Sequence, residues 1–256
     1  MKHFFIRCVA LTLIFLLCLN TTAMADFLIK EVASNPWNMM YIFPEEEEVI
    51  PNIVIIYLHG DGNNGTQKLE TLKVMGKVDH PLKYAMNDTL SLTDDTIFIC
   101  PQSRGNGQFR YQQDELLRLI RDIKIQFPES IILLAGHSNG AIAADKVALS
   151  GCEAIDGYVF ISGNQPAESP LLQFVSNAFV AYGESDTVAR RKDFKALFVE
   201  NDISLYEYSK KCAFEEKDSH NAYMVGKWTH GQAPRLFLEE FFWEWVWELQ
   251  MNKEGI

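Results

Sequence analysis

The sequence predicts an α/β fold in which strands alternate with helices around a mostly parallel sheet of about eight strands. Short β-branched runs such as NIVIIYL at 52–58 have no helical period and indicate buried strands. Segments with helical periodicity, such as 113–127, separate these runs, and the alternation is typical of parallel sheets covered on both faces. The chain has 256 residues, 48% of them hydrophobic, which suffices for one large core.

The first 25 residues have the pattern of a signal peptide. Lys2 and Arg7 precede a short apolar segment, and Ala23 and Ala25 are small residues at the positions that a signal peptidase recognises. We therefore expect cleavage before Asp26, a single domain over 26–256, and export to the periplasm or the medium without stable membrane insertion. An uncleaved N-terminal anchor is the alternative.

The charge of the remaining chain argues against two classes of partner. Residues 1–25 hold two of the 23 basic residues and none of the 34 acidic ones, which leaves 21 against 34 and a net charge of −13. Such a chain is not expected to bind nucleic acid or anionic membrane surfaces. Cys100, Cys152 and Cys212 have no metal-site spacing, and export leaves open one disulfide or three thiols.

The predicted elements follow one another along the whole chain. Strands are expected at 27–32, 39–43, 52–58, 96–100, 131–135, 157–161, 178–182 and 203–208. Helices are expected at 68–77, 113–127, 141–149 and 188–201, and a last helix begins at Pro234, where proline is tolerated. The run FFWEWVWEL in that helix indicates a helix docked on the sheet, with Glu240, Glu244 and Glu248 on its polar side.

One serine stands where a strand becomes a helix. In GHSNG, at 136–140, Ser138 lies between Gly136 and Gly140, directly after an apolar run. A serine hydroxyl is a weak nucleophile that needs exposure and a neighbouring base. A sharp turn supplies the exposure, and glycines two residues to either side relieve the crowding of its backbone. The pattern G-x-S-x-G in this context is the signature of a nucleophile elbow.

A second motif strengthens this interpretation. The strand at 52–58 runs into His59-Gly60-Asp61-Gly62, and with GHSNG and a late acid and histidine the chain resembles the α/β-hydrolase superfamily over nearly its whole mature length. In detail it is similar to the compact esterases of that superfamily, the dienelactone-hydrolase-like and prolyl-oligopeptidase-like branches. The resemblance implies an oxyanion hole formed by the backbone N–H groups of Asp61, or Gly62, and Asn139.

The family order of serine, acid and histidine selects the remaining catalytic candidates. Asp186 directly follows a predicted strand and would hold the histidine, although an aspartate there also suits the start of the next helix. Two histidines follow it in sequence. His220, in KDSHNAY, lies in the predicted loop after the strand at 203–208 and is the preferred base. His230, in WTHGQAP, is the alternative, and it becomes the preferred one if 203–208 is not the last strand.

These motifs lead to a serine hydrolase that cleaves a small ester or other acyl substrate through an acyl-enzyme. The short interval between 163 and 177 leaves no room for a large cap, which suits soluble substrates. A peptidase or amidase with the same residues is one alternative, and a hydrolase-fold binding protein without turnover is the other. No motif calls for a metal or an organic cofactor, and the oligomeric state stays open.

Overall fold

A computed structural model describes residues 27–32, 37–44, 50–61, 78–87, 89–90, 95–103, 109–163, 177–188, 211–216 and 219–254. The predicted signal peptide at 1–25, the helix at 68–77, all but the first residue of the helix at 188–201 and the strand at 203–208 lie outside these residues. The predicted short interval between 163 and 177 does so as well.

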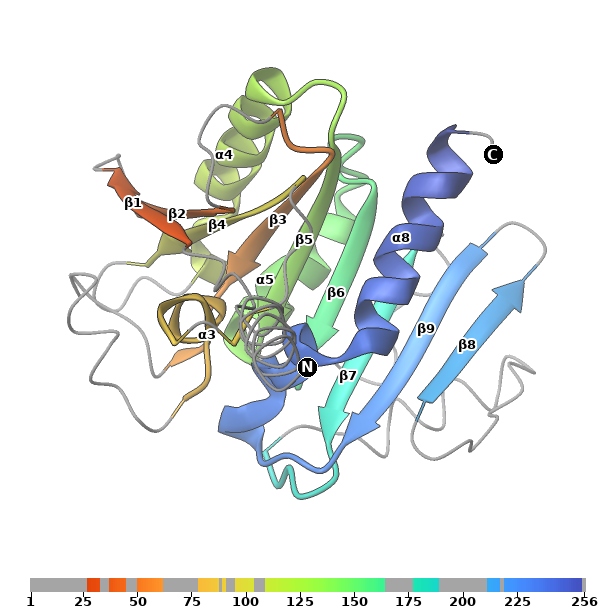
Figure 1. Cartoon of the computed structure of the whole chain (residues 1–256). Coiled ribbons are helices and arrows are strands. Elements are labelled where there is room, and N and C mark those ends of the chain that lie inside the picture. The colour runs from red at the N-terminus through yellow and green to blue at the C-terminus, as the bar shows by residue number, and fades with distance from the viewer. Residues whose placement is uncertain are drawn as a thin grey trace, which may run out of the picture.

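One sheet organises the described residues, with the strand order β1-β2-β4-β3-β5-β6-β7-β9-β8 (Figure 1). Its strands are β1 (Leu28–Val32), β2 (Asn38–Phe43), β3 (Ile53–Leu58), β4 (Thr96–Gln102), β5 (Ile131–His137), β6 (Gly157–Ile161), β7 (Ala178–Gly183), β8 (Lys211–Glu216) and β9 (Ser219–Gly226). The predicted fold class is confirmed, with nine strands where about eight were expected. The hairpin of β8 and β9 was not predicted.

The six central strands run in one direction, so that their carboxyl ends meet at one edge of the sheet. β4, β3, β5, β6, β7 and β9 pair in parallel, whereas β2 and β8 pair with their neighbours in the antiparallel sense. The segments that follow β3, β5, β7 and β9 begin at this edge. Ligands of open α/β sheets gather there, and four loops far apart in sequence are therefore brought together.

Helices cover both faces of the sheet. α4 (Gln113–Gln126) and α5 (Asn139–Leu149) pack on one face, through Leu116, Ile120 and Val147 among others. α3 (Pro81–Met86), the 3₁₀ helix η3 (His230–Leu238) and α8 (Glu240–Glu254) pack on the other, which faces the viewer in Figure 1. Residues of β3 alternate between the two cores and are all buried, which explains its unbroken apolar run.

The C-terminal segment differs from the prediction at its start. Pro234 lies inside η3, and the α-helix begins only at Glu240. In an α-helix that ran through 230–238, the Pro234 ring would clash with the carbonyl of His230 four residues earlier, so this stretch is a 3₁₀ helix that precedes α8. The predicted docking of α8 is confirmed, because Phe242, Trp245 and Leu249 are buried.

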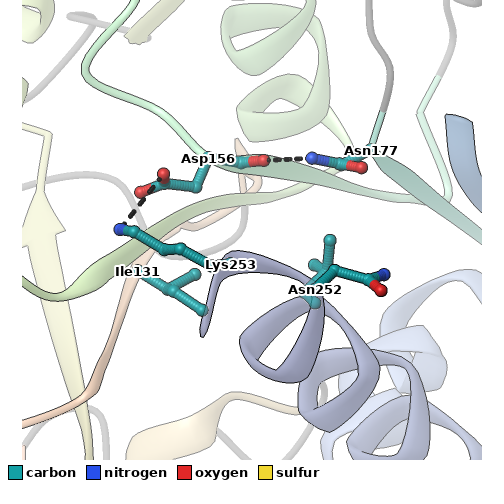
Figure 2. A pocket seen from close by; sticks show the side chains of 6 residues that line it. Ile131, Asp156, Asn177, Asn252 and Lys253 are labelled. Atoms are coloured by element: carbon teal, nitrogen blue, oxygen red, sulfur yellow. Dashed lines mark hydrogen bonds and ion pairs between the residues drawn. The ribbon is translucent and has the colours of Figure 1, made fainter. Parts of the chain in front are cut away.

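A pocket of about 280 Å³ lies at the opposite edge of the sheet, between the starts of the strands and the end of α8 (Figure 2). Lys253 of α8 approaches the Asp156 carboxylate to 3.4 Å, and the same carboxylate accepts the Ile132 N–H. The Asn177 side chain donates to the Asp156 carbonyl. These bonds tie α8 to the amino ends of β5 and β6, far from the edge that carries the motifs.

Two further findings concern the described residues alone. None of their helices has the length and apolar character needed to cross a membrane. Cys100 and Cys152 are free thiols in this part of the chain.

Candidate active site

Ser138 occupies a sharp turn between β5 and α5. β5 ends at His137 and α5 begins at Asn139, and Ser138 between them has φ 54° and ψ −115°. Non-glycine residues rarely adopt this backbone conformation, and it persists only where the surroundings enforce it. Here the Ser138 N–H donates to the Ile161 carbonyl of β6 at 2.9 Å, and the Ser138 carbonyl accepts from Ala141 and Ile142 in α5. The turn is the elbow that the motif predicted.

The two glycines of the motif are required by close backbone contacts. A Cβ on Gly140 would overlap the Leu58 carbonyl at the end of β3, and one on Gly136 would overlap the Gly140 carbonyl. α5 therefore crosses the ends of β3 and β5 at a distance that only glycine permits. This close crossing aims the amino end of α5, with its partial positive charge, at the Ser138 side chain.

A serine, a histidine and an aspartate form one hydrogen-bonded chain at this edge. The Ser138 hydroxyl lies 2.9 Å from Nε2 of His230, and Nδ1 of His230 lies 2.9 Å from Oδ2 of Asp186. The carboxylate accepts only, so His230 carries its proton on Nδ1 and presents Nε2 as the acceptor for the hydroxyl. This arrangement can take a proton from Ser138 and stabilise the resulting imidazolium.

The structure brings His230, and not His220, to the serine, which corrects the expected base. His220 is the second residue of β9, where it pairs with Glu215 of β8. β9 is parallel to β7 and reaches the carboxyl edge only at Gly226, opposite Gly183. Six residues of strand separate His220 from that edge, about 20 Å. The cause of the error is the hairpin: the last strand is β9, and the loop after it leads to His230.

Asp186 and His230 lie on two loops that are bonded to each other. Asp186 follows β7, and its side chain is fully buried. In the same loop the N–H groups of Glu184 and Ser185 donate to the carbonyls of Gly226 and Trp228. Oδ1 of Asp186 accepts the Val188 N–H at 2.8 Å, so the carboxylate also makes the local bond typical of a helix start. Both interpretations of Asp186 that the sequence left open are compatible with this geometry.

The oxyanion candidates lie beside the serine. Gly60 is so close that a Cβ there would meet the Ser138 Cβ at 3.0 Å, and Asp61 follows it at the end of β3. The Asn139 side chain donates to the Asp61 carboxylate, which joins the two segments whose backbone N–H groups are the predicted donors. Gly62, the alternative donor, lies outside the described residues.

Three further histidines are buried around these loops. His59 donates from Nδ1 to the Gly60 carbonyl and accepts the Ser103 N–H on Nε2, so it links the ends of β3 and β4. His80 accepts the Leu82 N–H, and His137 contacts the His230 carbonyl. Burial lowers the pKa of His59 to about 4, and it lowers those of His80 and His137 to about 3. All three are therefore neutral in the folded protein near pH 7.

These histidines predict a loss of stability in mild acid. The unfolded chain takes up three protons near pH 6.5 that the folded chain excludes, so the free energy of unfolding falls as the pH drops below that value. Between pH 7.5 and 5.5 we expect a loss of about 1.4 kcal/mol for each histidine. Urea unfolding at the two pH values measures it.

His80→Asn is the control for this prediction. The asparagine amide oxygen can still accept the Leu82 N–H, and one titrating group is removed. The loss of unfolding free energy between pH 7.5 and 5.5 should therefore shrink by about a third. Equal stability of the wild type at the two pH values would contradict the buried neutral state of the three histidines.

Two residues near His230, Asp79 and Trp228, were not found from the sequence. Asp79 donates its N–H to the Gly231 carbonyl, and its carboxylate contacts Arg235 at 2.8 Å. Trp228 packs its backbone against Gly183, where a Cβ would overlap the Trp228 carbonyl. Both act through contacts between distant segments, and no local pattern marks them.

Comparisons with known proteins agree on the fold. No family model matches the chain, and no curated protein matches it. A thermostable esterase superposes with a TM-score of 0.56 at 16% identity, over 87% of this chain and 63% of its own length. The substrate-bound fluorophosphonate-binding serine hydrolase FphF of Staphylococcus aureus gives 0.55 at 14%, over 88% and 98%. The Pyrococcus furiosus esterase Pf2001 gives 0.55 at 14%, over 90% and 93%.

Proposed function

We propose that this protein, which has the α/β-hydrolase fold, is an exported serine hydrolase that cleaves a carboxylic ester through an acyl-enzyme. One observation carries the proposal: the strained Ser138 turn presents its hydroxyl to His230, which in turn contacts the buried Asp186. Structural proteins have no reason to maintain a strained serine against a histidine whose other nitrogen is paired with a carboxylate.

The proposed reaction follows from the roles of these groups. The Ser138 oxygen attacks the substrate carbonyl while His230 takes the hydroxyl proton on Nε2. The Asp186 carboxylate keeps the Nδ1 proton in place and stabilises the imidazolium. The oxyanion that forms would be held by the backbone N–H groups of Asp61 and Asn139. His230 then returns the proton to the leaving alcohol, and water, activated by the same imidazole, releases the acid and restores Ser138.

The likeness to proteins named as esterases favours an ester over an amide as the substrate. The same residues would serve a peptidase, because both reactions pass through an acyl-enzyme. A small soluble acyl substrate fits the short interval after Gly163, and a net charge of −13 after signal cleavage argues against nucleic acid as a partner. Processing between Ala25 and Asp26 would be tested by N-terminal sequencing of protein recovered from the periplasm or the medium.

Hydrolysis of p-nitrophenyl acetate and butyrate, compared with aminoacyl p-nitroanilides, tests this function. We expect ester turnover that falls by a factor of 10⁴ to 10⁶ in Ser138→Ala, because the nucleophile is removed while binding is kept. The matched control is Ser185→Ala. The side chain of this serine is exposed, and its backbone N–H, which donates to the Trp228 carbonyl, is retained by the substitution. Preferred cleavage of the anilides would replace the esterase proposal with a peptidase. A folded wild type without turnover on either panel would overturn both.

A further inference from the structure

The side chain of His137 lies beside the base of the proposed reaction. It is the last residue of β5 and directly precedes Ser138, yet its buried ring lies 5.0 Å from the His230 ring, measured between centroids. Nε2 of His137 lies 2.8 Å from the His230 backbone carbonyl. A carbonyl oxygen can only accept, so the His137 Nε2 carries a proton and donates it to this bond.

The surroundings of His137 fix its charge and its tautomer. Burial lowers its pKa to about 3; the neighbouring His230 ring acts in the same direction, and the bond to the His230 carbonyl acts in the opposite one. Nδ1 is buried without a hydrogen-bond partner among the described residues, so a second proton there would be a buried donor without an acceptor. His137 is thus neutral and protonated on Nε2, whereas His230 is protonated on Nδ1. The two adjacent rings therefore cannot exchange their hydrogen-bonding roles.

Three different parts of the fold hold the backbone around the base. The Ser185 N–H of the acid loop binds the Trp228 carbonyl, and the Asp79 N–H binds the Gly231 carbonyl. The carbonyl between them, that of His230 itself, is bound by His137. This last bond joins the base segment to the elbow directly and does not involve the Ser138 hydroxyl. It therefore sets the distance between the His230 ring and the Ser138 hydroxyl before any substrate binds.

We propose that His137 is a positioning residue that holds His230 at hydrogen-bond distance from Ser138 through the His230 carbonyl. The proposal rests on the proposed function, in which that distance governs proton transfer. A displacement of the base by about 1 Å can lower the rate about 100-fold. Removal of the donor should therefore lower kcat by a factor of 10 to 100. KM should change less than threefold, because the buried His137 side chain is not exposed to a bound substrate.

Two substitutions at this position separate positioning from packing. His137→Phe keeps a ring of similar size and removes the donor. His137→Gln can place an amide N–H near the position of Nε2 and should keep kcat within about fivefold of the wild type. Both are assayed for kcat and KM on p-nitrophenyl acetate, and their thermal unfolding is followed in parallel. His137→Leu is the second donor-lacking variant if His137→Phe does not fold.

Loss of kcat in the donor-lacking variant with rescue in His137→Gln, at similar thermal midpoints, supports the proposal. Unchanged kcat in the donor-lacking variant overturns it. An equal loss in both variants, or unfolding of both donor-lacking variants, assigns His137 a structural role only and overturns it too.

A measurement without turnover distinguishes failure of this proposal from failure of the proposed function. In protein labelled with ¹⁵N-histidine, the low-field proton of the His230 Nδ1–H bond to Asp186 is observed by NMR. It should persist in the wild type and in His137→Gln, and it should broaden or vanish in the donor-lacking variant. An unchanged signal in that variant contradicts the positioning role. An inactive wild type with the expected signals contradicts the hydrolase proposal alone.

Discussion

His230→Gln should lower kcat/KM for p-nitrophenyl acetate by a factor of 10⁴ or more, and His220→Gln should leave it within about twofold. The large effect follows from the 2.9 Å contact between Nε2 of His230 and the Ser138 hydroxyl, since without a base the hydroxyl is a weak nucleophile. The absence of an effect at His220 follows from its place near the start of β9, about 20 Å of strand from the carboxyl edge.

The two variants form a matched pair, since each replaces one histidine after Asp186 by the same amide. Steady-state kinetics gives kcat/KM, and circular dichroism confirms that both proteins fold. A large loss in His220→Gln with activity kept in His230→Gln would contradict the placement of β9 and the base assignment together.

Gly140→Ala should destabilise the protein by about 3 kcal/mol or more, the largest effect on stability that we expect from adding one methyl group. The new Cβ would overlap the Leu58 carbonyl and meet the His59 carbonyl at 2.9 Å, and both are backbone atoms that cannot rotate away. Relief requires α5 to move off β3, which also displaces Ser138 and the oxyanion loop. Turnover should therefore fall together with stability.

Gly151→Ala is the control for this prediction. It lies just after the end of α5 with φ +67°, and a Cβ there meets nothing within 4 Å. The substitution should cost only about 1 kcal/mol, from the left-handed backbone alone. Urea unfolding of both variants measures the difference. Equal small losses would contradict the close crossing of α5 over the strand ends.

The sequence predicted the parts of the site that are encoded locally. The elbow was found because its glycines and its serine are neighbours in the chain and the turn needs all three. The strands at 52–58 and 131–135 were found because burial on both faces leaves a continuous apolar run. Asp186 was found because a single strand, β7, leads directly to it.

The sequence favoured His220 over His230 because the position of the histidine beside Ser138 depends on pairing between distant strands. KCAFEE and SHNAYMVG mix charged, polar and apolar residues, and neither has the unbroken apolar run that marked the central strands. Only the register of β9 against β7 shows which end of β9 lies at the carboxyl edge. The bond from His137 to His230 spans 93 positions and leaves no trace in either local pattern.

Activation of the Ser138 hydroxyl by His230 is the central premise of the proposed function. A fluorophosphonate probe tests this directly, because it forms a stable adduct only with an activated hydroxyl. Intact-mass measurement and peptide mapping should show one adduct per chain, on Ser138, in the folded wild type and none in Ser138→Ala. Folded wild-type protein that stays unlabelled, or that carries its adduct on another residue, would contradict it.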